Sequence, residues 1–137
     1  EPSQQFDVLA VDAFSSDAIP VHLLTREAIL LYLRHIKPDG IVAIHTSNKF
    51  LELAPIAKQL ADSTGYSAVL VVNQEDDPNL VFNSDWVLIT RNQSFLELAA
   101  ITSSSDPIAV PKQLSLWTDD YNSLFRILRP ITWRSSE

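Results

Sequence analysis

The sequence predicts an α/β fold with a mainly parallel sheet, in which the elements follow the order β-α-β-α-β-β. Continuous apolar runs at residues 8–11, 41–44 and 67–72 lack polar alternation, which is typical of strands buried on both faces of a parallel sheet. Amphipathic segments lie between these runs. Because strand–helix–strand connections are right-handed in about 98% of cases, we expect both helices on one face of the sheet.

The two crossover helices have recognisable ends. The first is expected over residues 23–36, with Thr25 as a possible N-cap and the Lys-Pro-Asp-Gly segment at 37–40 as its stop. The second is expected over residues 51–64, with Pro55 in its first turn and Gly65 after its last. Their predicted apolar stripes are Leu24, Ala28, Leu31, His35, Ile29, Leu33 and Ile36 in the first, and Leu53, Ile56, Ala57 and Leu60 in the second.

The remaining chain predicts one more strand and a helical tail within a single domain, 1–137. A fourth strand at 84–91 is joined to the third by the acidic loop 74–79, and a connection of this length without a helix indicates an antiparallel hairpin. The other expected segments are a short helix at 94–100, a loop at 102–116, a last helix at 119–128 capped by Thr118 or Asp119, and a flexible tail at 130–137.

Composition narrows the classes of function. The chain has 137 residues, a formal net charge of −7 and no cysteine, so disulfides, thiolate metal sites and a cysteine nucleophile are excluded. The negative charge argues against binding along a nucleic-acid backbone and is compatible with a cationic partner such as a polyamine. No apolar run approaches the ~18 residues of a membrane span, so we expect no membrane contact by this segment and a cytoplasmic location by default.

Cofactor and metal sites are not expected from the residue pattern. Gly40 and Gly65 are the two glycines of the chain, so it contains no Gly-x-Gly-x-x-Gly turn to hold a nucleotide. The histidines at 22, 35 and 45 do not have the i, i+4 spacing of a helical metal site.

Asp12 is the main candidate for chemistry because it ends the first apolar strand. Ligands of open α/β sheets bind outside the carboxyl ends of the strands, and a partly desolvated carboxylate there suits a general base. Asp17 would supply a second negative charge for an amine substrate, and Ser15 and Ser16 would supply hydroxyl contacts. The alternative is that Asp12 caps the following loop and Asp17 is solvated.

His45 and Asn48 follow the second strand at the equivalent position and are candidates to line the same cleft. A lone histidine is more often a hydrogen-bonded structural residue, so both interpretations stay open. The acidic residues 75–77 either gate a cationic substrate or form a solvated loop.

Several of these segments together resemble the spermidine/spermine synthase family. Residues 6–12, the Ser-Ser-Asp that follows, Leu-Leu-Thr at 23–25 and the segment 33–40 carry the resemblance, which covers nearly the whole chain. It is closest to bacterial synthase-like proteins, some of which are fused to a transporter-like membrane half. Their Asp-Ala-Phe-Ser-Ser-Asp-Ala-Ile-Pro signature stands at 12–20, and Trp-Thr-Asp-Asp-Tyr at 117–121 resembles their late Thr-Asp-Asp segment.

The resemblance implies a partial methyltransferase-like Rossmann fold, with family strands 4-5-7-6 of the order 3-2-1-4-5-7-6 and the last strand antiparallel. Decarboxylated S-adenosylmethionine would be the co-substrate, held by a glycine-rich half that these residues do not supply, and its aminopropyl group would pass to a polyamine. Asp12 matches the proposed base of the family. Four residues separate Asp12 from Asp17, whereas authentic synthases have two between their carboxylates.

The isolated chain is therefore expected to be inactive, and two other functions stay open. One is a methyltransferase-like protein that uses S-adenosylmethionine and another acceptor, and the other is a non-catalytic interaction module. The half-fold also predicts that the first strand is an unpaired edge with residues 8–11 exposed. The sheet face opposite the helices then needs a cover, which the C-terminal helix or a second copy in a homodimer would provide.

Overall fold

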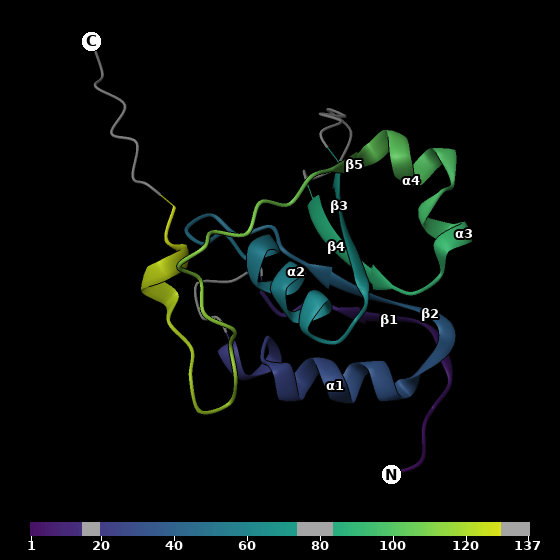
Figure 1. The fold of residues 1–137 in the computed structure, drawn as a ribbon, viewed down its shortest axis with the longest axis horizontal. Helices are drawn as coiled ribbons and strands as arrows, with labels where there is room; N and C mark the ends of the chain where they lie inside the picture. Colours follow the sequence, from purple (N-terminus) through teal and green to yellow (C-terminus); the bar gives the residue numbers. More distant parts are fainter. Residues whose placement is uncertain (15–19, 74–83, 130–137) are drawn as a thin grey trace.

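The computed structural model describes residues 1–14, 20–73 and 84–129 as an α/β fold (Figure 1). The predicted tail at 130–137 and the acidic loop at 74–79 lie outside the described residues. The strands are β1 (Phe6–Val11), β2 (Ile36–His45), β3 (Ser67–Asn73), β4 (Ser84–Thr90) and β5 (Ser105–Asp106). The helices are α1 (Arg26–His35), α2 (Ala54–Ser63), α3 (Gln93–Leu96) and α4 (Ala99–Ser104), with 3-10 turns η1 (Val21–Leu23) and η2 (Leu124–Ile127).

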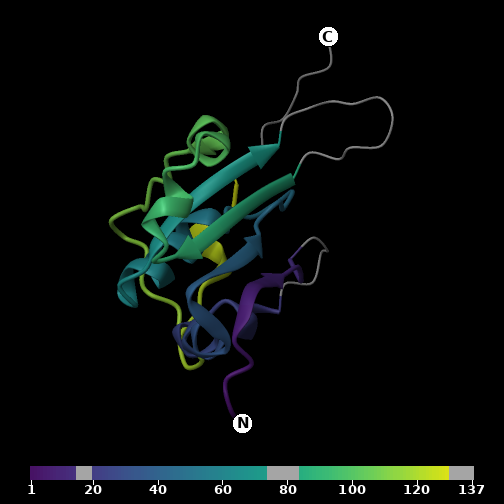
Figure 2. The same cartoon turned by 90° about the vertical axis from the view of Figure 1, so that its right-hand side faces the viewer.

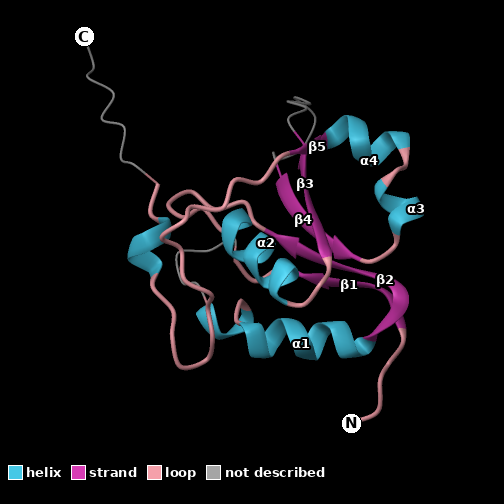
Figure 3. Ribbon diagram, in the orientation of Figure 1, coloured by secondary structure: helices cyan, strands magenta, loops and turns pink. Residues whose placement is uncertain are grey.

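The sheet has the order β1-β2-β4-β3-β5 (Figure 3). β1 and β2 pair in parallel, whereas β4 pairs antiparallel with both β2 and β3. The predicted β3–β4 hairpin is therefore confirmed, and the order matches the 4-5-7-6 arrangement with its antiparallel strand. β1, β2 and β3 share one direction, but β4 lies between β2 and β3, so most of the hydrogen-bonded pairings are antiparallel and not parallel as expected.

Three of the four predicted signals at the ends of the two long helices are confirmed. Thr25 is the N-cap of α1, and its Oγ1 accepts a hydrogen bond from the Ala28 amide at 3.3 Å. Pro55 lies in the first turn of α2, and Gly65 follows that helix with a φ of 73°, a conformation that glycine adopts without strain. Both helices are shorter than expected because the flanking residues leave the helical conformation.

The core lies between the sheet and the two long helices. Val42 and Ile44 of β2 and Val87 and Ile89 of β4 are completely buried, and they belong to one apolar cluster with the inward side chains of α1 and α2. Figure 2, turned by 90° from Figure 1, shows the strands of the sheet side by side. Because the buried side chains of α1 and α2 belong to the same apolar cluster as those of β2 and β4, both crossover helices cover the same face, as predicted. The buried helix residues are Ile29 in α1 and Ile56, Ala57, Leu60 and Ala61 in α2.

We call the opposite side of the sheet the open face. Its side chains alternate along each strand with those that face the helices: Val8, Ala10, Ile41, Ala43, His45, Val69, Val71, Trp86 and Leu88. Val8 is 57% exposed. The expectation of a first strand buried on both faces is therefore wrong, because β1 is an edge strand and only Leu9 and Val11 pack against the core. Leu31, on the predicted stripe of the first helix, is also exposed.

The C-terminal segment 107–129 packs on the helix side of the molecule. Leu114, Trp117 and Ile127 are buried in the same core as the helices, and Gln59 of α2 donates a hydrogen bond to the Leu114 carbonyl at 2.7 Å. Within the described part of the chain, this segment does not cover the open face, so that part of the expectation is wrong.

The predicted helix at 119–128 is also wrong, because only the 3-10 turn η2 forms there. The polar groups that would begin the helix bind α1 instead. The Asp119 carboxylate accepts a hydrogen bond from Thr25 at 2.7 Å, and the Asp119 amide donates to Glu27 at 3.0 Å. Thr118 and Tyr121 close a turn through reciprocal backbone hydrogen bonds. The expected helix at 94–100 is found as α3 and α4, so the expected loop at 102–116 begins only after β5.

Residues 37–40, which were expected to end the first helix, lie inside β2, where they interrupt its regular pairing with β1. Phe6 pairs with Ile36 and Val8 pairs with Ile41, so β2 has extra residues between these two pairs. Gly40 fits there because a Cβ atom at this position would lie 2.9 Å from the Cβ of Ile36.

Candidate functional site

Asp12 and His45 meet at the carboxyl ends of β1 and β2. The parallel register pairs Val11 with Ile44, so the next residue of each strand lies on the open face at the same edge. His45 Nδ1 lies 2.7 Å from Asp12 Oδ1. The His45 side chain is 14% exposed and that of Asp12 is 57% exposed, so the carboxylate is more accessible than the partly desolvated group that the sequence predicts.

The indole ring of Trp86 stacks on the imidazole ring of His45. His45 is paired with Trp86 in the antiparallel β2–β4 ladder, and the two rings stack with centroids 4.8 Å apart and an angle of 22° between their planes. His45 Nε2 is shielded from solvent and has no hydrogen-bond partner among the described residues. When Nδ1 carries the proton and donates it to Asp12, Nε2 is an unpaired acceptor. Trp86 could not be identified from the sequence, because its role depends on strand register.

Asn48 connects the segments that follow the two strands. Its Nδ2 donates to the Phe14 carbonyl at 2.9 Å, and its Oδ1 accepts from the amides of Phe50 and Leu51 at 2.9 and 3.0 Å. These contacts fix the backbone around the site, and the predicted contact of Asn48 with a substrate stays a prediction. Ser15, Ser16 and Asp17 lie outside the described residues.

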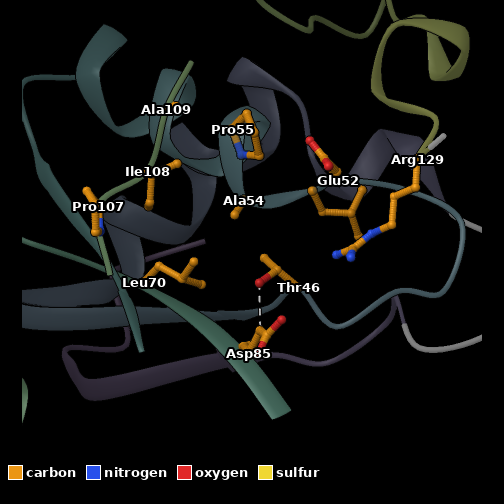
Figure 4. A pocket seen from close by; sticks show the side chains of 11 residues that line it. Thr46, Glu52, Ala54, Pro55, Leu70, Asp85, Pro107, Ile108, Ala109 and Arg129 are labelled. Atoms are coloured by element: carbon orange, nitrogen blue, oxygen red, sulfur yellow. Dashed lines mark hydrogen bonds between the residues drawn. The ribbon is translucent and has the colours of Figure 1, made fainter. Parts of the chain in front are cut away.

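A second concave region lies on the helix side of the sheet, where β2 ends and α2 begins (Figure 4). It has a volume of about 250 Å³. Charged residues of both signs line it together with apolar ones: Glu52, Asp85, Arg129, Leu53, Leu70 and Ile108. Thr46 forms part of its wall and is only 3% exposed, and its hydroxyl donates to the Asp85 carbonyl at 3.2 Å. Sequence reasoning missed this cavity because its residues come from six separate stretches of the chain.

Among the described residues, two side chains outside these sites have raised pKa values. Burial raises the pKa of the Tyr32 hydroxyl, which donates a hydrogen bond to the Leu23 carbonyl at 2.9 Å. The hydrogen bond to the Asp7 carboxylate and its charge raise the pKa of Lys37.

Metal and membrane features were searched over residues 1–14, 20–73 and 84–129. That part of the chain contains no group of three or more His, Cys, Asp or Glu side chains that could hold a metal ion. None of its helices is long and apolar enough to cross a bilayer.

Comparison with known proteins gives a partial likeness to solved structures. No family model matches the sequence, and no curated protein matches it. The crystal structure of spermidine synthase from Thermotoga maritima aligns with a TM-score of 0.46 and 16% sequence identity. The alignment covers 87% of this chain but only 39% of that enzyme, so the chain spans well under half of its length. The strand order and directions described above, rather than this likeness, establish the α/β fold.

Proposed function

We propose that this chain is the acceptor-binding part of an aminopropyltransferase-like protein, in which Asp12 is the general base toward a polyamine amine. The observation that carries the proposal is the 2.7 Å contact between Asp12 and His45 at the carboxyl edge of the parallel β1–β2 pair. The signature at residues 12–20, which resembles that of spermidine/spermine synthases, supports it.

The chemistry requires a carboxylate at this position. A polyamine is cationic near neutral pH, so an exposed carboxylate attracts it and accepts the proton that the amine must lose before it attacks. In the transfer, the amine nitrogen forms a bond to the aminopropyl carbon while the carbon–sulfur bond of the sulfonium donor breaks, and the electron pair stays on sulfur. The hydrogen bond from His45 orients the Asp12 carboxylate, and because the carboxylate is 57% exposed it passes the proton to solvent directly.

The donor side of the reaction is not assigned to this chain. Decarboxylated S-adenosylmethionine, or S-adenosylmethionine in the methyltransferase-like alternative, would need a glycine-rich cradle, and Gly40 and Gly65 do not form one. The proposal therefore assigns acceptor binding to these residues and expects no turnover from them alone.

Binding of the acceptor tests the proposal directly. Putrescine and spermidine, titrated by calorimetry, should bind the chain, and Asp12→Asn should weaken binding by about tenfold because it removes one charge-assisted hydrogen bond. NMR signals of His45 and of the Trp86 indole should shift on binding. Asp120→Asn, which removes an exposed carboxylate elsewhere, is the matched control and should bind like the wild type.

Equal affinity in the Asp12 variant and the control would contradict the role of Asp12. In a longer protein that also binds the donor, the same Asp12→Asn change should lower turnover about 10²- to 10⁴-fold. Supplying decarboxylated and ordinary S-adenosylmethionine in parallel then separates aminopropyl from methyl transfer.

We further propose a homodimer through the edge of β1. Phe6 and Val8 are 44% and 57% exposed, and one side of this strand has no paired neighbour in the described sheet. Light scattering should give the mass of a dimer for the wild type and of a monomer for Val8→Lys, because a lysine on an edge strand opposes pairing. Leu30→Lys on the exposed side of α1 should remain dimeric. A wild-type monomer at the highest attainable concentration would refute this proposal.

A further inference from the structure

We propose that the cavity on the helix side of the sheet binds a small zwitterion with an apolar side chain, of the class of the branched-chain α-amino acids. This inference is independent of the proposed transferase role, because His45 points to the open face and the next residue, Thr46, lines the cavity on the other face.

The charged groups of the cavity are available to a ligand. The carboxylates of Glu52 and Asp85 form no ion pair or hydrogen bond with any other described residue. Arg129 uses Nε for a hydrogen bond to the Leu51 carbonyl at 3.3 Å, and its two terminal nitrogens have no partner in the described part of the chain. One cavity thus presents unpaired charges of both signs, which suits a ligand that carries both.

The positive and negative groups come from separate segments. Arg129 follows η2, and in Figure 4 its guanidinium points toward Thr46, on the same side of the cavity as Glu52, while Ala54 and Pro55 line the wall at the start of α2. The N-terminus of α2 lacks a side-chain cap, so its dipole adds positive potential to the guanidinium. Asp85, the second residue of β4, lies on the other side of the cavity. A carboxylate near Arg129 and an ammonium near Asp85 would therefore both be satisfied.

The rest of the wall is apolar and the volume is small. Leu70, Pro107 and Ile108 lie together at the end of the cavity away from Arg129 (Figure 4). A volume of about 250 Å³ is below the usual range for drug-sized ligands. A compact aliphatic group next to a zwitterionic head fits this space and polarity, whereas an extended polyamine would place charge against the apolar end.

A ligand series on the wild-type chain tests the chemical class. Calorimetry with L-leucine, isoamylamine, isocaproate, glycine and putrescine varies the charges and the apolar group separately. Leucine should bind at least tenfold more tightly than each of the other four, because only leucine can use both charged ends and the apolar wall. If none of the five binds, or if isoamylamine, isocaproate or glycine binds as tightly as leucine, the proposal is overturned. Putrescine that binds Asp12→Asn as tightly as leucine does would also overturn it.

Two variants test which charged residue binds each end of the ligand. Arg129→Gln should weaken leucine and isocaproate about tenfold and leave isoamylamine unchanged, whereas Asp85→Asn should weaken leucine and isoamylamine and leave isocaproate unchanged. Arg126→Gln and Asp120→Asn are the charge-matched controls, since both residues are exposed and do not line the cavity. Unchanged leucine affinity in both test variants would overturn the assignment. Putrescine binding that is lost in Asp12→Asn but retained in Arg129→Gln and Asp85→Asn takes place at the Asp12 site and not in the cavity.

Discussion

Replacing Thr25 by valine keeps the shape of a completely buried side chain and removes the hydrogen bonds of its hydroxyl. Oγ1 accepts from the Ala28 amide at the start of α1 and donates to the Asp119 carboxylate at 2.7 Å, with the His22 carbonyl as a more distant second acceptor at 3.3 Å. Loss of an N-cap costs about 1 kcal/mol. Loss of a hydrogen bond to a carboxylate costs about 1.5 kcal/mol, the low end of the range, because Asp119 is exposed. We therefore expect Thr25→Val to lower the free energy of unfolding by about 2.5 kcal/mol.

Urea denaturation followed by circular dichroism measures this loss, and the melting temperature should fall by about 8 °C for a chain of this size. Thr25→Ser keeps both hydrogen bonds and should lose less than about 1 kcal/mol. Asp119→Ala removes only the second bond, so combining it with Thr25→Val should cost little more than Thr25→Val alone. A Thr25→Val variant within about 0.5 kcal/mol of the wild type would refute the reasoning, and so would a serine variant that is equally unstable.

Three other predictions concern proton binding, packing and a surface ion pair. Burial raises the pKa of the Tyr32 hydroxyl, so the folded state holds the phenolic proton more tightly than the unfolded state does. The free energy of unfolding should therefore fall as the pH rises above about 10, and Tyr32→Phe should make that fall less steep in denaturation curves. Gly40→Ala should destabilise the fold by about 1–3 kcal/mol in thermal unfolding, because the added Cβ would meet Ile36, and an unchanged melting temperature would contradict this. Asp62→Asn breaks the exposed pair with Lys58 and should cost less than about 0.5 kcal/mol, with no difference left at high salt.

Local signals predicted most of the fold. Thr25, Pro55 and Gly65 mark helix ends through contacts within a few residues, so their roles are readable from the sequence. The segment at 118–121 is different, because Asp119 binds Thr25 and Glu27, which lie more than ninety residues earlier. Its composition is typical of a helix start, and only the tertiary structure shows that its polar groups are used elsewhere.

The candidate sites were predictable to different degrees. Asp12 and His45 each follow an apolar strand, and two parallel strands bring their ends to one edge, so their proximity follows from the pattern. The cavity with Glu52, Asp85 and Arg129 could not be predicted, since its charged residues belong to segments with no shared motif. An apolar run also does not show which neighbours will cover it. The exposure of β1 was therefore predicted from the half-fold interpretation and not from the residues of the strand itself.

The position of β4 has a consequence for how the sheet assembles. β2 pairs with β4 and not with β3, although β3 comes first along the chain, so β3 is connected to the β1–β2 pair only through the later strand. We expect the β3–β4 hairpin to form as a unit and then dock on β2. The amides of β3 and β4 should then exchange with solvent through one common opening, with a free energy distinct from that of α1.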